Sequence, residues 1–182
     1  MRIRYVGDPV LRERAREVDP AELPALQPLI DDMIATMREA GGAGLAANQV
    51  GELVRIAVAE VPEVGNPRYP YKPPIPLTVM INPVIEPLGP ETLPIIEGCL
   101  SVPGLRGELD RFAAVRVRYL DRDANEREDT FEGLSAGTFQ HEADHLDGVL
   151  FLDRVTDPRT FMTWEEFETR HRDQWLARIG LG

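Results

Sequence analysis

The stretch SAGTFQHEADHL, residues 135–146, predicts a helix that carries a metal site. His141 and His145 are four positions apart, so on a helix they lie on the same face and can bind one divalent metal ion. Glu142 lies one position on, about 100° around the helix, which places its carboxylate beside the metal but outside the set of ligands. A carboxylate in that place is suited to holding a reactive water molecule, so the stretch indicates a metal-dependent hydrolase.

A catalytic zinc-type site needs three protein ligands and one open position, so a third ligand has to come from elsewhere in the chain. One candidate is a downstream acid, as in zincin endopeptidases, and Glu165, Glu166 and Glu168 follow the helix. The other is the only cysteine, Cys99, whose thiolate would be deprotonated and held beside a dication. A free cysteine is otherwise often a small buried apolar residue, so spacing alone leaves both candidates open.

The segments around this helix predict a mixture of helices and strands. Apolar residues from Leu26 to Met37 recur at three- and four-residue steps and predict a helix that ends at Gly41-Gly42. Ser135 is the expected N-cap of the metal helix, and Gly148 follows its end. Strands are expected over residues 54–61, 77–85 and 113–121, with residues 126–131 as a hairpin partner.

A final helix is expected over residues 160–179, with Phe161, Trp164, Phe167 and His171 along one stripe. The order of helix, several strands and two helices favours an α+β fold. We therefore expect antiparallel sheets packed around the metal helix, with an N-terminal and a C-terminal helix. A chain of 182 residues has the length of one domain, which we expect to span residues 1–182.

Residues 61–76 contain six prolines. Proline removes a backbone donor and fixes φ, which excludes a helix or a central strand and favours an extended surface loop of polyproline II character. One interpretation is that this loop binds an SH3-like domain. A stiff connection between two strands explains the prolines more simply.

Charge and composition narrow the classes of partner. The net charge is −11 and the pI about 4.8, and an acidic chain is a poor binder of nucleic acid, where affinity comes from lysine and arginine. One cysteine forms no intrachain disulfide, which fits a reducing compartment. The chain has neither an apolar run of membrane-spanning length nor a secretory signal at its start, so we expect a cytoplasmic protein without membrane contact.

Three motifs in order give the chain a close resemblance to the peptide deformylase family. They are GAGLAANQ at residues 42–49, EGCLS at residues 97–101 and QHEADH at residues 140–145. The tracts GDPVLR at residues 7–12 and HLDGVLF at residues 145–151 also resemble that family, so the similarity covers about residues 5–155. Asn48 stands where many members have proline or threonine, and we expect little effect from it.

The resemblance implies a reaction and a division of roles. The reaction is hydrolysis of the formyl group from N-formylmethionine at the start of new polypeptides, releasing formate. Cys99, His141 and His145 would hold the metal, and Glu142 would be the general acid/base. The remaining alternatives are a zincin endopeptidase that uses Glu165 or Glu166, and a metal-binding homologue that has lost turnover.

The same resemblance assigns the donors that would meet the substrate. The side-chain amide of Gln49 and the backbone N–H of Leu100 would stabilise the oxyanion, and Gly44 would offer its backbone to the peptide. Helix spacing places Leu134 and Thr138 on the face of His141, where they would line an apolar slot for the methionine side chain. The opposite wall of this slot is expected to come from Gly42, Ala43 and the region of Ile96.

The ligand set alone favours zinc, because one thiolate and two imidazoles suit a tetrahedral Zn²⁺ site. The resemblance instead implies Fe²⁺, one ion per chain, with Zn²⁺, Ni²⁺ or Co²⁺ able to replace it. Nascent formylmethionyl peptides are the implied partners. Some members dock on the ribosome through a basic C-terminal helix. Here Arg170, Arg172 and Arg178 are offset by neighbouring acids, so the helix is not clearly basic.

Overall fold

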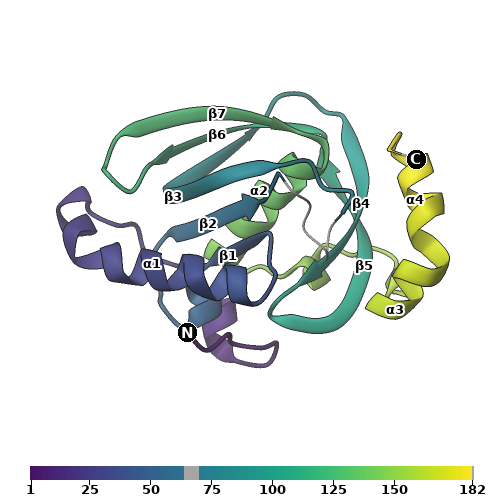
Figure 1. The fold of residues 1–182 in the computed structure, drawn as a ribbon, viewed down its shortest axis with the longest axis horizontal. Helices are drawn as coiled ribbons and strands as arrows, with labels where there is room; N and C mark the ends of the chain where they lie inside the picture. Colours follow the sequence, from purple (N-terminus) through teal and green to yellow (C-terminus); the bar gives the residue numbers. More distant parts are fainter. Residues whose placement is uncertain (64–69, 182) are drawn as a thin grey trace.

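The computed structural model describes residues 1–63 and 70–181, and it contains two antiparallel sheets with one helix, α2, in contact with both (Figure 1). The larger sheet has the order β1-β2-β3-β6-β7, with bounds Gly44–Ala46, Ile56–Val61, Ile75–Pro87, Ala114–Leu120 and Glu126–Glu132. The smaller has the order β4-β5-β8, with bounds Thr92–Cys99, Val102–Phe112 and Met162–Thr163. The helices are α1 (Leu23–Glu39), α2 (Gly133–Leu146), α3 (Trp164–Glu166) and α4 (Arg172–Arg178). The predicted α+β fold is confirmed.

Strand β2 is buried on both faces, and its side chains differ in size between them. Ile56 and Val58 belong to the core cluster that contains the apolar face of α1. Ala57 and Ala59 point the other way, into the cluster that contains Phe139 of α2. Because alanine is small, α2 can pack closely against the middle of the sheet.

The position of α2 is fixed by close contacts on two sides. Phe139 is fully buried and stacks on Phe131 of β7, with 3.7 Å between ring centroids. On the side of the smaller sheet, a Cβ at Gly137 would lie 2.5 Å from Cδ1 of Ile95. A larger residue at Gly137 would therefore push the helix away from β4.

Several expected elements are confirmed with shifted ends. Helix α1 contains the predicted apolar stripe, and β2, β3, β6 and β7 correspond to the four predicted strands. The expected N-cap of α2 is wrong: the helix begins at Gly133 after Glu132, and Ser135 lies inside its first turn. Gly133 has a φ of +56°, a conformation that suits glycine and lets the chain turn directly from β7 into the helix.

The predicted start of the final helix is also wrong. Thr160 ends a 3-10 turn, and Met162–Thr163 form β8, which pairs with β5. Helix α3 begins at Trp164, and the Thr163 hydroxyl accepts a hydrogen bond from a backbone N–H of its first turn. Threonine competes well as a cap outside a helix, which explains why the helix starts there.

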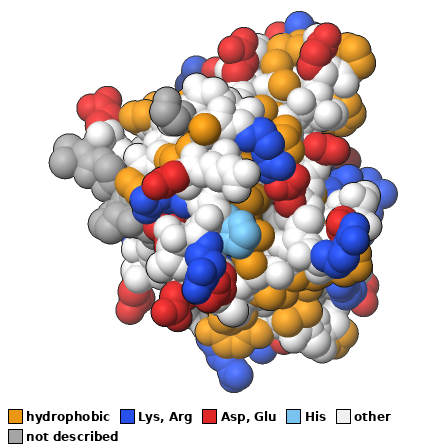
Figure 2. Space-filling view, turned by 90° about the vertical axis from the view of Figure 1, so that its right-hand side faces the viewer, with side chains coloured by type: hydrophobic (Ala, Val, Ile, Leu, Met, Phe, Trp, Pro, Cys, Tyr) orange, Lys and Arg blue, Asp and Glu red, His pale blue; other side chains and the backbone are white. Residues whose placement is uncertain are grey.

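The predicted apolar stripe of this helix is only partly correct. A π-helical turn over Phe167–His171 separates α3 from α4. The extra residue of that turn rotates the later part of the helix. His171 is therefore exposed, and Trp175 is buried instead against β4, where its indole N–H donates to the carbonyl of Pro94 at 3.0 Å. Figure 2 shows cationic and anionic side chains interspersed over this side of the molecule.

The proline-rich segment is extended only in part. Val61 ends β2 and Ile75 begins β3, so the predicted loop over residues 61–76 is wrong at both ends. Residues 62–63 and 70–74 form no helix or strand, and the rest of the predicted loop, residues 64–69, lies outside the described residues. No helix in the described part of the chain is both long and apolar enough to cross a membrane.

Candidate metal centre

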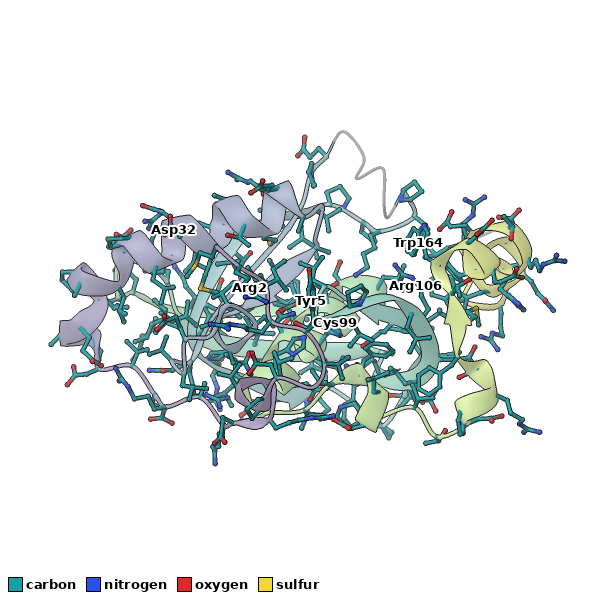
Figure 3. The ribbon with its side chains drawn as sticks, turned by 90° about the horizontal axis from the view of Figure 1, so that it is seen from below. Arg2, Tyr5, Asp32, Cys99, Arg106 and Trp164 are labelled. Atoms are coloured by element: carbon teal, nitrogen blue, oxygen red, sulfur yellow. The ribbon has the colours of Figure 1, made fainter. Side chains whose placement is uncertain are left out.

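The three predicted metal ligands meet between the smaller sheet and α2. Cys99 ends β4, and Figure 3 places its side chain near the middle of the molecule. Its Sγ atom lies 3.2 Å from Nε2 of His145, which in turn lies 3.2 Å from Nε2 of His141. Among the described residues, these three form the one group of acids, histidines and cysteines close enough to hold a metal ion, with ligand atoms within 4.8 Å of one another.

These distances fit a small divalent ion. In a tetrahedral site with metal–sulfur and metal–nitrogen bonds of about 2.3 and 2.1 Å, neighbouring ligand atoms are about 3.4–3.6 Å apart. The two measured separations of 3.2 Å are close to that range. Glu165 and Glu166, the ligands of the endopeptidase alternative, lie on α3 and are exposed. The structure therefore favours the cysteine ligand set.

Glu97 fixes the orientation of His141. Its Oε2 atom lies 2.8 Å from Nδ1 of His141, so the other ring nitrogen, Nε2, faces the cysteine and the second histidine. Burial would raise the pKa of Glu97, but Arg111 and His141 beside it hold that pKa far below its usual range. Glu97 belongs to the EGCLS motif, yet the sequence predicted no role for it, because its partner His141 lies 44 residues away.

Arg111 extends this contact toward the surface. Its Nε and Nη2 atoms donate to the two carboxylate oxygens of Glu97 at 2.7 and 3.0 Å, and its Nη1 donates to Asp144 at 2.6 Å. Asp144 also accepts hydrogen bonds from Arg154, whose side chain is 46% exposed. The buried ion pair of Glu97 and Arg111 is thus linked through Asp144 to Arg154, and the network ends at the exposed side chain of Arg154. Sequence reasoning missed Arg111, which no motif contained.

The two histidines have different environments. Burial, with the neighbouring charge of His141, lowers the pKa of His145 well below its usual value. A neutral imidazole is the form that binds metal, so this environment favours binding. Burial also lowers the pKa of His141, but Glu97 and Cys99 raise it by more, and the net shift is upward. Metal binding by His141 would therefore be coupled to the release of a proton.

Glu142 is buried beside this group without belonging to it. Its Oε2 atom has no hydrogen-bond partner among the described residues, and a Cβ at Gly44 would lie only 2.2 Å from its Oε1. Burial raises the pKa of Glu142 to about 7, although His141 and Lys72 act in the opposite direction. A carboxyl group with a pKa near neutrality can both take up and release a proton under ordinary conditions.

A set of donors surrounds the cysteine sulfur. The Oε1 atom of Gln49 accepts from the backbone N–H of Ala46 at 2.8 Å, which turns its amide nitrogen toward the site. That nitrogen donates to Ser101 Oγ at 3.0 Å and to Cys99 Sγ at 3.4 Å. The backbone N–H of Ser101 adds a contact of 3.3 Å to the same sulfur. Leu100 lies in the turn between these two residues and lines the pocket. The sequence predicted no role for Ser101, although this residue belongs to the EGCLS motif.

Asn48 is also more closely connected to the site than its sequence position suggested. Its side chain is fully buried and donates to the backbone carbonyl of His145. The contact joins the 3-10 turn Ala47–Val50 to the end of α2. We expected little effect from asparagine at this position, and the sequence offered no sign of this contact.

One pocket contains the residues that were predicted to meet the substrate. Gly44 and Ala43 line one side, and Leu134 and Thr138 line the side that belongs to α2. Glu142 lines the same pocket. Tyr71, Lys72, Arg106 and Trp175 are among the lining residues that were not predicted. Arg106 stacks on Trp164 with its Cζ atom 3.8 Å from the ring centroid, at the edge nearest the C-terminal helix (Figure 3).

Comparisons with known proteins agree with this geometry. A sequence model of the family described as polypeptide deformylase matches residues 1–161. The chain is 44% identical over 163 residues to peptide deformylase 2 of Nostoc sp., covering 90% of each protein. It is similar to the Met-Ala-Ser-bound class I type b peptide deformylase of Acinetobacter baumannii, with a TM-score of 0.81, 39% identity and coverage of 85% and 98%. It is also similar to an actinonin-bound peptide deformylase of Synechococcus elongatus, with a TM-score of 0.77, 33% identity and coverage of 100% and 87%.

Removing the cysteine should abolish metal binding. We expect Cys99→Ala to lose its bound metal, because the two imidazoles alone leave a site with too few ligands. Glu166→Gln, which changes a candidate ligand of the endopeptidase alternative, should keep it. Metal content per chain after dialysis measures both. Loss of metal in Glu166→Gln with retention in Cys99→Ala would contradict this ligand set.

Glu142 should make the stability of chelator-treated protein depend on pH. Its carboxyl has a pKa of about 7 in the folded chain and an ordinary value near 4.5 in the unfolded chain. Between these values the unfolded state releases a proton that the folded state keeps, so stability falls as the pH rises. Glu142→Gln removes this effect. Between pH 4.5 and 7.5 its free energy of unfolding should therefore rise relative to that of the wild type, by up to roughly 3 kcal/mol. Urea unfolding measures it; a difference that is constant with pH would contradict the prediction.

Proposed function

The chain belongs to the peptide deformylase family, and from that premise we propose that Cys99, His141 and His145 hold the divalent metal ion of a deformylase. Deformylases hydrolyse the formyl group of N-formylmethionine at the start of new polypeptides. The observation that carries the proposal is the meeting of one sulfur and two Nε2 atoms around a point that Glu142 borders without joining. We further propose that residues 1–182 act as one catalytic domain.

The chemistry assigned to the chain follows from these positions. When bound, the metal acts as a Lewis acid that lowers the pKa of water and polarises the formyl oxygen. Glu142 takes the proton of the attacking water and passes it to the nitrogen of the leaving amine, so that formate and a free amino terminus result. Its pKa of about 7 suits both transfers, since one group must accept a proton and then release it.

Two donors are proposed to stabilise the negative charge that forms on the formyl oxygen. We assign this role to the side-chain amide of Gln49 and the backbone N–H of Leu100. The hydrogen bond from the backbone of Ala46 holds the Gln49 amide in one orientation, so little reorganisation is needed during the reaction. A preorganised donor of this kind typically contributes about 3–4 kcal/mol to transition-state stabilisation.

The substrate peptide is proposed to extend along β1. This strand is at the end of the larger sheet and pairs with β2 on one side, and its first residue, Gly44, lines the pocket. Edge strands bind extended peptides through backbone hydrogen bonds. The side chain of methionine would enter the apolar part of the pocket, between Leu134 on α2 and Ala43 on the opposite wall.

We propose Fe²⁺ as the native metal, one ion per chain, with Zn²⁺, Ni²⁺ or Co²⁺ able to replace it. The support for iron is family membership, because a thiolate with two imidazoles would equally suit zinc. Nascent formylmethionyl peptides are the proposed partners, and since ribosomes make them in the cytoplasm, we place the enzyme there. The ribosome stays a possible partner, although Arg172 and Arg178 of α4 pair with Glu168 and Glu108, so this helix is not clearly basic.

The first test concerns Glu142. Glu142→Ala should keep its metal, because Glu142 is not a ligand, but lose turnover by about 10²–10⁴, the usual scale for a positioned acid/base. Formate release from a formyl-Met peptide and metal analysis of the same preparation measure the two effects. A parallel loss of metal and activity would show that Glu142 has a different role.

A second test concerns the methionine pocket. Leu134→Asp places a charge in the apolar wall, so the KM for formyl-Met peptides should rise while metal content stays near one per chain. Leu88→Asp, at an exposed position, serves as the control for folding and net charge. An unchanged KM in a folded, metal-loaded Leu134→Asp protein would remove Leu134 from the pocket.

The native metal can be tested by reconstitution. One metal-free preparation should be loaded with Fe²⁺, Zn²⁺, Ni²⁺ or Co²⁺ and assayed for formate release in air and without oxygen. We expect iron to give activity that decays in air, since ferrous iron and a thiolate are both oxidisable, and nickel or cobalt to give durable activity. We expect zinc to bind firmly and catalyse less well. Equal and air-stable activity with iron and zinc would exclude the iron assignment.

A further inference from the structure

The chain has a single lysine, and that lysine lines the pocket of the metal centre. Its other basic side chains are arginines, apart from three histidines, so Lys72 is the only ε-ammonium group in 182 residues. It comes from the proline-rich segment before β3, which the catalytic roles proposed above leave unexplained. Lys72 therefore adds a positively charged donor to the pocket proposed for the substrate.

Lys72 is positioned by two contacts of its segment. Its Nζ atom donates a hydrogen bond to Thr138 Oγ1 on α2, with 2.8 Å between the atoms. The preceding residue, Tyr71, packs edge-on against Trp175 and Phe167 of the C-terminal region, with 5.3 and 6.2 Å between ring centroids. The segment is therefore anchored on one side to the metal helix and on the other to the C-terminal helix.

The ammonium group lies beside the proposed site of the first side chain. Thr138 follows Leu134 by one helical turn and precedes Glu142 by another, so the three share one face of α2. All three residues and Lys72 line the same pocket. The pocket is thus apolar at Leu134 and Ile95 and polar where Lys72 meets Thr138.

We propose that Lys72 is a specificity-determining residue, whose ammonium group forms the polar end of the pocket and favours first side chains that end in a hydrogen-bond acceptor. This inference rests on the proposed function. A wholly apolar slot treats methionine and norleucine nearly alike, because they differ by sulfur against methylene. A charged donor at its end gains no additional hydrogen bond from a methylene, a weak one from a thioether and a strong one from a sulfoxide oxygen.

The inference extends the substrate class to peptides that start with formylmethionine sulfoxide, the oxidised form of the normal start residue. An ammonium carries three N–H donors, so Nζ can serve Thr138 and a substrate oxygen at the same time. The sulfoxide peptide should therefore be a better substrate than the norleucine peptide, although its side chain is more polar.

The test compares three peptides that differ only in the first side chain: formyl-norleucine, formyl-methionine and formyl-methionine sulfoxide, each followed by Ala-Ser. The kcat/KM for formate release is measured with metal-loaded wild type, Lys72→Met and Lys72→Arg. Lys72→Met keeps an unbranched side chain of similar length but has no charge, and it should lower the sulfoxide-to-norleucine ratio roughly tenfold, the effect of one charged hydrogen bond. Lys72→Arg keeps a cationic donor and should retain most of the ratio.

Two controls separate this effect from others. Arg159→Met removes one positive charge at a side chain that is 89% exposed, and it should leave the ratio unchanged. Acetylation of the wild type with an amine-selective reagent modifies only Lys72 and the N-terminus, and it should reproduce the ratio of Lys72→Met. The same treatment of Lys72→Arg reaches only the N-terminus and should change nothing.

The outcomes are distinct. A ratio that is the same in wild type and Lys72→Met, or an equal change for all three peptides, would overturn the role of Lys72 while leaving the deformylase mechanism intact. A metal-loaded wild type that releases no formate from any of the peptides would overturn the proposed function, and the inference with it. A ratio that falls equally in Lys72→Met and Arg159→Met would show an effect of net charge and would also overturn the inference.

Discussion

The ion pair between Glu97 and Arg111 joins β4 to β5 within the smaller sheet, and its further contacts with His141 and Asp144 hold the helix that carries both histidines. Both side chains are almost fully buried, and a buried ion pair by itself seldom stabilises a fold, because both charges lose their hydration. Here each charge has a further partner, His141 for the carboxylate and Asp144 for the guanidinium. Each charge thereby gains a further hydrogen bond, and the imidazole of His141 is held with one nitrogen toward Cys99 and His145. The fold thus keeps a polar network in its interior, and the metal centre depends on it.

Apolar packing also fixes the position of α2 between the two sheets. The alanines of β2 and Gly137 of the helix leave room for α2 between the two sheets, so the backbone itself approaches the strands. Gly44 has a similar effect at the site, since any side chain there would occupy the place of the Glu142 carboxylate. Small residues next to this buried helix therefore help to fix its position, because they allow close packing against both sheets.

The sequence predicted the features that depend on nearby residues and missed those that depend on distant ones. The spacing of His141 and His145 is set within one helix, and the apolar run of β2 within one strand, so both could be predicted. Strands β4 and β5 carry prolines, glycines and charges, and sequence patterns did not identify them. Arg111 could not be identified for another reason. Its role depends on the ion pair with Glu97, and the two residues come together only when β4 pairs with β5. The third ligand needed the family resemblance, because spacing alone left an acid and a cysteine as alternatives.

The contact of Trp175 with Tyr71 has an evolutionary consequence. The C-terminal helix lies beyond residue 161, where the match to the family ends, yet it supplies one wall of the pocket and supports the segment that supplies another. A substitution in this tail can therefore reshape the pocket without altering any proposed metal ligand or Glu142. One gene thus encodes the shape of the cavity and the proposed reactive groups in separate segments, so mutation can alter either one alone.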